Sequence, residues 1–102
     1  MGAVAFTPHS SVEILVTAGG QANIPVPGYG RFLRLVNNGA AQMHVRFYEA
    51  LDTPPVVTVG TGMLLPSGAI EVFSVPSDST RVAALNDGTA DGVINVTRGE
   101  GT

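Results

Sequence analysis

Few side chains in this sequence could do chemistry, and those that could are spread along the chain. His9 and His44 are the only histidines, and they stand in different segments, outside any H-x-H or H-x-x-H pair. A metal site of the kind that jelly rolls carry needs about three His and a carboxylate, or two His with one carboxylate. The chain lacks Cys, which excludes a disulfide framework and a thiolate site. We therefore predict no metal centre and no cofactor, and we expect His44 on a polar strand face beside Arg46 and Tyr48.

Nucleophilic and acid–base chemistry also lack their usual settings. The serines stand in turns or strands, and none belongs to a G-x-S-x-G elbow. Glycoside hydrolysis needs two carboxylates facing each other across a cleft, and nothing singles out Glu13, Glu49 or Glu71 for that task. Asp87 and Asp91 fall short of a calcium-loop spacing, so we expect an Asx-turn hairpin there. The sequence thus predicts no catalytic residues and a protein that is not an enzyme.

Charge is scarce on this chain, and apolar residues are plentiful. Of its 102 residues, 44% are hydrophobic and 13% are charged, with a formal net charge of −3. Because so little charge is available for the surface, we expect a partner or further copies of the chain to cover part of the apolar surface. We predict a homo-oligomer, with a trimer favoured for a position on a three-fold axis.

Nucleic acid and membranes are not expected as partners. The basic residues are all Arg, and they are too scattered to follow a phosphate backbone. The N-terminus lacks the basic region of a signal peptide, and no apolar run approaches the ~20 residues of a membrane-spanning helix. The basic residues are Arg31, Arg34, Arg46, Arg81 and Arg98.

Short Val-, Ile- and Phe-rich segments, separated by Gly, Pro and Asn turns, run through the whole chain. No stretch shows the apolar period of a helix. We predict an all-β fold, a single-domain β-sandwich or jelly roll of about seven to nine short antiparallel strands. Residues 11–98 should form the domain, 1–10 an N-terminal arm or edge strand, and 99–102 a C-terminal tail. The expected strands are 11–17, 21–26 (an edge strand or loop, because of its prolines), 31–37, 42–48, 56–59, 69–75, 80–85 and 93–98.

A predicted interface follows from the turn at Asn37-Asn38-Gly39. Asn-Gly between two alternating segments is typical of a hairpin, which would pair 31–37 with 42–48. Arg and Tyr on the outer face of that hairpin then suit a protein interface, although a solvated face explains them equally well. In the arm, Phe6 and Pro8 could help to add a strand to a neighbour's sheet edge. The candidate interface residues are Phe6, Pro8, Arg34, Arg46 and Tyr48.

A family resemblance emerges from residue 31 to the end of the chain. The order RLVNNG, HVRFYE, GTGMLLPSG, IEVFSVP, TRVAALNDG and VINVTRGEGT resembles small all-β virion structural proteins of tailed bacteriophages. The resemblance implies a capsid cement (decoration) protein that binds the outer shell and stabilises it between capsomers. Its partners would be the major capsid protein or other virion proteins. Its place would be the capsid surface of the virion, after assembly in the host cytoplasm.

Two alternatives stay open at this point. The first is a neck, tail or head-fibre component of the virion, which the sequence does not distinguish from a cement protein. The second is a carbohydrate-binding β-sandwich. That role usually relies on aromatic platforms, but Trp is absent, and the two tyrosines are Tyr29 and Tyr48.

Overall fold

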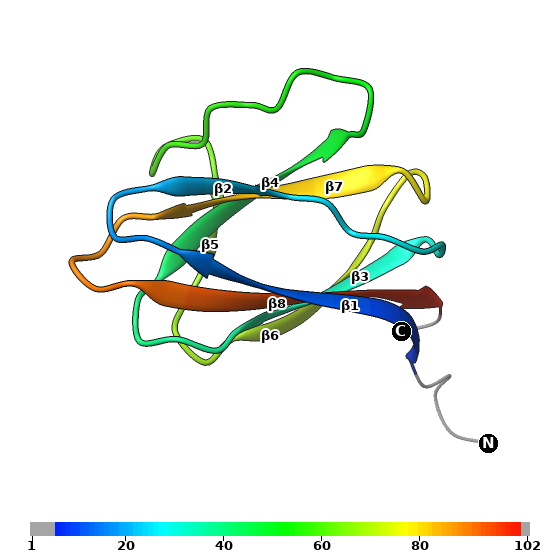
Figure 1. Ribbon diagram of the computed structural model, residues 1–102, viewed down its shortest axis with the longest axis horizontal. Coiled ribbons are helices and arrows are strands. Elements are labelled where there is room, and N and C mark those ends of the chain that lie inside the picture. Colours follow the sequence, from blue (N-terminus) through cyan, green and yellow to red (C-terminus); the bar gives the residue numbers. More distant parts are fainter. Residues whose placement is uncertain (1–5, 101–102) are drawn as a thin grey trace.

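Two four-stranded antiparallel sheets face each other in the computed structural model, which describes residues 6–100 (Figure 1). None of the described residues is helical. The eight strands are β1 (Thr7–Val16), β2 (Gln21–Ile24), β3 (Phe32–Asn37), β4 (Met43–Glu49), β5 (Met63–Leu65), β6 (Ile70–Ser74), β7 (Thr80–Asn86) and β8 (Gly92–Glu100).

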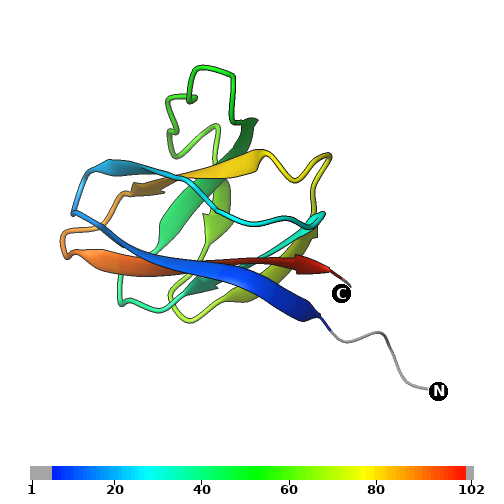
Figure 2. The same cartoon turned by 45° about the vertical axis from the view of Figure 1, so that its right-hand side comes forward.

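The strand order is that of a jelly roll. The first sheet has the order β1-β8-β3-β6 and the second sheet the order β2-β7-β4-β5. The chain therefore changes sheet at every connection except β4 to β5, and its first strand pairs with its last. Figure 2 shows the two layers from a second side. The predicted all-β sandwich or jelly roll is confirmed.

The core lies between the sheets and follows the two-residue alternation of each strand. Most inward positions of both sheets carry aliphatic side chains that are almost fully buried, while outward positions are more exposed. The first sheet contributes Val16, Leu33, Leu35, Ile94 and Val96; the second contributes Ile24, Met43, Val45, Leu65, Val82 and Ala84.

The two terminal strands are longer than predicted. β1 begins at Thr7, and a bulge between Pro8 and Ser10 carries it past the proline. β8 extends to Glu100, so the predicted boundaries after residues 10 and 98 both fall inside strands. Gly99 lies inside β8 because the Thr7 carbonyl approaches it so closely that a Cβ would overlap the carbonyl oxygen. The rest of the predicted arm and tail, 1–5 and 101–102, lies outside the described residues.

The prediction of a strand at 56–59 was wrong. This segment belongs to the β4–β5 loop, residues 50–62, which is drawn in green in Figure 1. Its backbone bonds to a side chain and forms no ladder: Val57 N donates to Gln21 Oε1 at 2.9 Å, and Gln21 Nε2 donates to Pro55 O at 2.7 Å. Val57 itself is buried. The loop is therefore held against the second sheet.

The predicted hairpin at Asn37-Asn38-Gly39 was also wrong, because β3 and β4 belong to different sheets. A two-residue type I′ turn needs a positive φ at both central residues, and neither Asn38 nor Gly39 has one. Asn37 points inward instead and is fully buried. Its Nδ2 donates to Ala41 O at 2.8 Å and Leu65 O at 2.9 Å, and its Oδ1 accepts from Gly39 N at 3.3 Å. The turn is an arch that carries the chain over the core.

A second arch, between β7 and β8, repeats this arrangement. The buried Asn86 donates through Nδ2 to Val16 O at 2.9 Å and Ala90 O at 2.8 Å, and its Oδ1 accepts from Gly88 N at 2.9 Å. Asn86 thus makes the expected Asx turn, but the predicted hairpin at Asp87–Asp91 was wrong, since β7 and β8 lie in different sheets.

Candidate interaction surfaces

The predicted interface residues divide between the two outer faces of the sandwich. Phe6 and Arg34 meet on the outer face of the first sheet, where the Arg34 Cζ lies 5.7 Å from the centroid of the Phe6 ring. This is a cation–π contact. The Arg34 Nε is buried and has no hydrogen-bond partner among residues 6–100. Pro8 is exposed in β1, paired with Gly99.

Arg46 and Tyr48 lie two residues apart on β4, on the outer face of the second sheet. Arg46 is exposed and Tyr48 half-buried. The expectation that Arg34 and Arg46 share a sheet face was therefore wrong. The two side chains lie on different faces because the arch at Asn37 places β3 and β4 across the core from each other.

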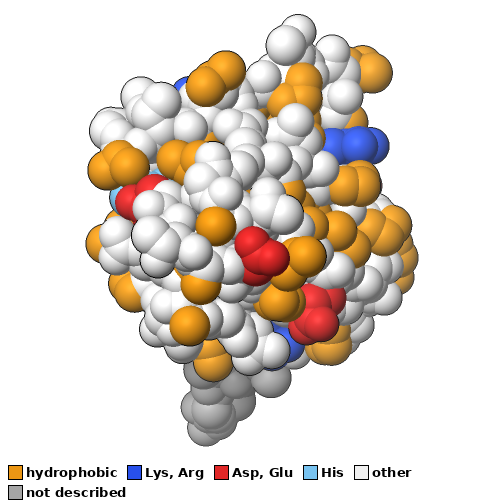
Figure 3. Space-filling model, turned by 60° about the vertical axis from the view of Figure 1, so that its left-hand side comes forward, with side chains coloured by type: hydrophobic (Ala, Val, Ile, Leu, Met, Phe, Trp, Pro, Cys, Tyr) orange, Lys and Arg blue, Asp and Glu red, His pale blue; other side chains and the backbone are white. Residues whose placement is uncertain are grey.

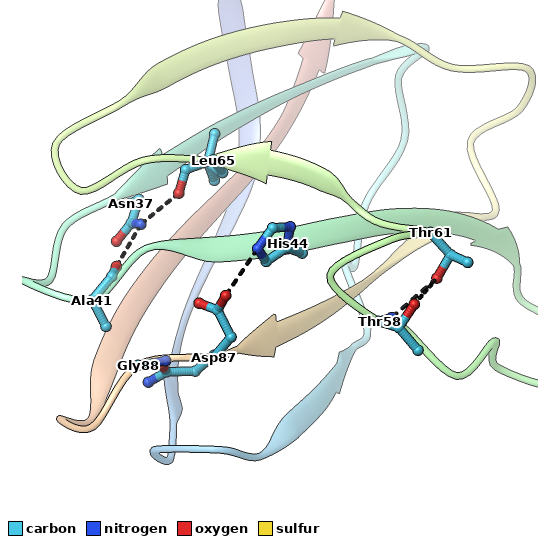
Figure 4. A network of polar contacts seen from close by, with 9 residues as sticks. Asn37, Ala41, His44, Thr58, Thr61, Leu65, Asp87 and Gly88 are labelled. Atoms are coloured by element: carbon cyan, nitrogen blue, oxygen red, sulfur yellow. Dashed lines mark hydrogen bonds and ion pairs between the residues drawn. The ribbon is translucent and has the colours of Figure 1, made fainter.

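His44 shares that outer face but is covered by the β4–β5 loop. A Cβ on Gly62 would lie 2.7 Å from the His44 Cβ, so the loop backbone at Gly62 packs directly against His44 of β4. The His44 Nε2 lies 3.1 Å from Asp87 Oδ2, and Figure 4 shows the two side chains pointing toward each other. The His44 Nδ1 is buried without a hydrogen-bond partner in the described chain. Within residues 6–100, no group of three His, Asp or Glu side chains is arranged to hold a metal ion, and no pocket is present.

Glu49, at the end of β4, gathers three hydroxyl donors. Its Oε1 accepts from Ser77 Oγ at 2.5 Å and Ser79 Oγ at 2.8 Å, and its Oε2 accepts from Thr80 Oγ1 at 2.7 Å. These bonds, that of Ser77 most of all, hold the pKa of the Glu49 carboxyl below its ordinary value of 4.5. The arrangement fixes the β6–β7 loop to β4 and leaves the carboxylate engaged as an acceptor.

The Glu49 cluster predicts a pH dependence of stability. A carboxyl whose pKa is lowered on folding stabilises the fold above its unfolded pKa, and this contribution is lost as the pH falls through the folded pKa. We expect Glu49→Gln to lower the free energy of unfolding at neutral pH, and the deficit to shrink as the pH falls below 4.5. Urea denaturation across that range measures it. Glu13→Gln, in the exposed part of β1, is the matched control. A loss of stability for Glu49→Gln that is equal at all pH values would contradict a lowered pKa of Glu49 in the folded protein.

Sequence reasoning missed Arg98, which is fully buried between the sheets. Its guanidinium donates to three backbone carbonyls: Nε to Val26 O at 3.4 Å, Nη1 to Gly30 O at 2.9 Å, and Nη2 to Thr80 O. Burial lowers the pKa of Arg98, and the carboxylates of Asp78 and Glu49 oppose that shift. The two-residue alternation of β8 could have indicated this burial, since Arg98 follows Ile94 and Val96 on the inward face of the strand.

Large apolar side chains are exposed on several elements, and two of these groups lie on the β4–β5 loop and on β6. On the β4–β5 loop, Leu51 is 101% exposed and Val56 78%, and on the edge strand β6, Ile70 is 61% exposed and Val72 37%. Figure 3 shows one side of the molecule, where apolar side chains are spread over the surface with few charged groups among them. Surfaces of this kind are typical of contact with another protein.

An aromatic pair lies at the other edge of the first sheet. The His9 and Tyr29 rings stack with their centroids 4.3 Å apart and their planes at 26°. Tyr29 remains 58% exposed. The stacking on His9 therefore fixes the orientation of the exposed Tyr29 ring.

Comparison with known proteins identifies a fold but no family. No protein-family model and no curated protein sequence matches this chain. The solved crystal structure of PirA is similar in fold, with a TM-score of 0.60 and 16% sequence identity over 85% of this chain and 91% of that chain. At this identity the similarity concerns the fold alone. The described residues include no helix that is long and apolar enough to cross a membrane.

Proposed function

We propose that this protein is a structural component of a tailed-phage virion, and most specifically a capsid cement protein. It would bind the major capsid protein on the outer shell and stabilise the shell between capsomers. The phage context is supported by the resemblance of residues 31–102 to small virion proteins. The structural observation that carries the proposal is the β4–β5 loop, which presents Leu51 and Val56 to solvent on an anchored backbone.

The anchoring of this loop favours binding. Gln21 holds Pro55 and Val57 through both ends of its amide, and Thr58 N donates to Thr61 Oγ1 at 3.0 Å within the loop (Figure 4). A loop that is already ordered loses little conformational entropy when it docks, so more of the apolar burial contributes to affinity. Many equivalent copies on a shell further reduce the affinity that each copy needs.

We expect Leu51→Asp to weaken binding to purified shells that lack this protein by about tenfold or more, since a fully exposed apolar side chain would be buried at the contact. Co-sedimentation of the variant with shells measures the loss. Thr53→Asp adds the same charge to an exposed position of the same loop and should bind as the unchanged protein does. Equal binding of both variants would remove the loop from the interface.

Copy number separates cement from the neck, tail and head-fibre alternative. Quantitative mass spectrometry of purified particles should find the protein near-stoichiometric with the major shell protein if it is cement. A small fixed number of copies per particle would assign it to the neck or tail, and absence from particles would contradict both virion roles.

The exposed Tyr29 ring, stacked on His9, favours a carbohydrate-binding module as the second candidate. Sugars bind through the faces of such held aromatic rings. A glycan array probed with the purified protein tests this role. Binding that is lost in Tyr29→Ala and kept in Tyr48→Ala would support it over the virion proposal.

A further inference from the structure

The edge strand β6 has one charged residue, Glu71, as its protection, and it lacks the bulge, the proline or the short length that marks the other three sheet edges. Natural sheets protect their edges with bulges, prolines, charges or very short strands. β1 carries a bulge between Pro8 and Ser10, Pro25 follows β2 directly, and β5 has three residues. β6 pairs with β3 in unbroken register over five residues, and contains neither a bulge nor a proline.

The unpaired backbone groups of β6 can be identified from its register. Asn37 N donates to Ala69 O at 3.0 Å, and Val75 N donates to Arg31 O at 2.7 Å, so the odd-numbered positions of this strand face β3. Backbone groups alternate in direction along an antiparallel strand. The N–H and C=O groups of Ile70, Val72 and Ser74 therefore point away from the sheet.

We propose that β6 is the docking edge for a second copy of this chain, which adds its own β6 antiparallel about a two-fold axis at Val72. In this register Val72 faces Val72 of the partner subunit, and Ile70 faces Ser74 of the partner subunit. Three residue pairs, all with outward-directed backbone groups, then face each other, and each can exchange two hydrogen bonds. The two first sheets become one continuous sheet across the dimer.

Charge selects this register among the possible ones. A shift of two residues in one direction would place Glu71 directly opposite Glu71 of the partner subunit, and like charges in that position are destabilising. A shift of two residues in the other direction would bring Pro76, which has no N–H, against Ile70. A shift of one residue would set outward-directed groups against groups already bonded to β3. The register centred on Val72 avoids all three and places Glu71 beside Phe73 of the partner subunit.

The outer face of the sheet continues the same pattern. Val36 pairs with Ile70 across β3 and β6, and both Ile70 and Val72 are exposed in the single chain. Two-fold pairing brings the two Val72 side chains together, and Arg34 lies on the β3 side of each Val72. The contact is isologous and closes at two copies, so it predicts a dimer where the sequence favoured a trimer. The inference is independent of the proposed phage role.

Sedimentation equilibrium of the full chain, from micromolar to millimolar concentration, tests the pairing. We expect a monomer–dimer equilibrium for the unchanged protein and a monomer for Val72→Lys, which sets two ammonium groups against each other at the axis. Leu15→Lys makes the same kind of change at an exposed position on the opposite edge of the same sheet and should still dimerise. A monomer or trimer of the unchanged protein, or a dimer of Val72→Lys, would overturn the proposal.

A cross-link provides a second readout that does not depend on a disruptive variant. The chain has no Cys, so Val72→Cys carries a single thiol. Directly opposite residues in a hydrogen-bonded antiparallel pair have Cα atoms about 5.5 Å apart, which is within the range for a disulfide. Mild oxidation should give a covalent dimer of Val72→Cys and far less of Leu15→Cys. Equal cross-linking of the two variants would count against a specific β6 contact.

Discussion

Replacing Arg98 by Met is expected to lower the free energy of unfolding by about 3 to 5 kcal/mol, because each buried acceptor left unpaired costs about 1 to 3 kcal/mol. The guanidinium binds the carbonyls of Val26 and Gly30, both in the β2–β3 connection, and of Thr80 at the start of β7. Met fills a similar volume but donates no hydrogen bond. The loss should therefore come from the three carbonyls rather than from a cavity.

Urea denaturation followed by circular dichroism measures this loss. Arg98→Lys keeps the charge but lacks the planar fork that reaches three acceptors, so we expect an intermediate deficit. Arg31→Met is the matched control, because Arg31 is exposed and its substitution should change stability by less than about 0.5 kcal/mol. If Arg98→Met were as stable as Arg31→Met, the three carbonyls would have to find other partners, contrary to the structure.

The nearly isosteric substitution Asn37→Asp is expected to lower the free energy of unfolding by about 2 to 4 kcal/mol at neutral pH, because two hydrogen bonds are lost and their acceptors then face a carboxylate oxygen. The amide Nδ2 that donates to Ala41 O and Leu65 O becomes a carboxylate oxygen, which faces two acceptors and donates to neither. Asn86→Asp should behave in the same way against Val16 O and Ala90 O. Both substitutions preserve shape, so they isolate the role of the amide donor.

Thermal and urea unfolding of both variants measure the effect, with Asn38→Asp as the control at an exposed position of the same arch. The deficits of Asn37→Asp and Asn86→Asp should narrow at acid pH, since a protonated carboxyl regains one donor. A deficit that Asn38→Asp matched would show that charge in the turn, rather than the buried amide, is responsible.

The strands were predictable from the sequence because their signal is local. Alternation along 11–17, 42–48 and 93–98 identifies which side chains face the core, and the structure places strands over these segments. The strand partners were not predictable. Asn-Gly after β3 predicts a hairpin, but the choice between pairing with β4 and arching over the core depends on the distant Leu65 carbonyl that Asn37 binds.

The two arches share a pattern that was visible in the sequence and not used. Asn37-Asn38-Gly39 and Asn86-Asp87-Gly88 have the same N-x-G spacing, and each has an Ala four residues after the Asn. Their contacts match in detail, with the buried Asn accepting from the Gly two residues on and donating four residues on. A repeated inward Asn at the end of a buried strand is therefore a usable sequence signal for an arch.

The candidate interface residues stay a prediction, but the expected placement of Arg34 and Arg46 on one sheet face was wrong. These residues were chosen for their chemical type, and the assumption of a hairpin placed Arg34 and Arg46 together. Exposed aliphatic side chains such as Leu51 and Ile70 carry no local signal that distinguishes them from core residues. Whether Phe6 covers its own sheet, as it does over Arg34, depends on contacts between segments far apart in the sequence.

The pairing of β1 with β8 has a consequence for how the protein is made. Of the eight strands the ribosome makes β8 last, and until then β1 has no neighbour in the first sheet and β3 has only β6. The nascent chain therefore carries β1 without its partner until β8 has been made, and the first sheet closes only when β8 emerges. Pairings between distant segments also form slowly. The fold is therefore completed only after β8 has been made, and the unpaired β1 is vulnerable in the interval between the synthesis of β1 and that of β8.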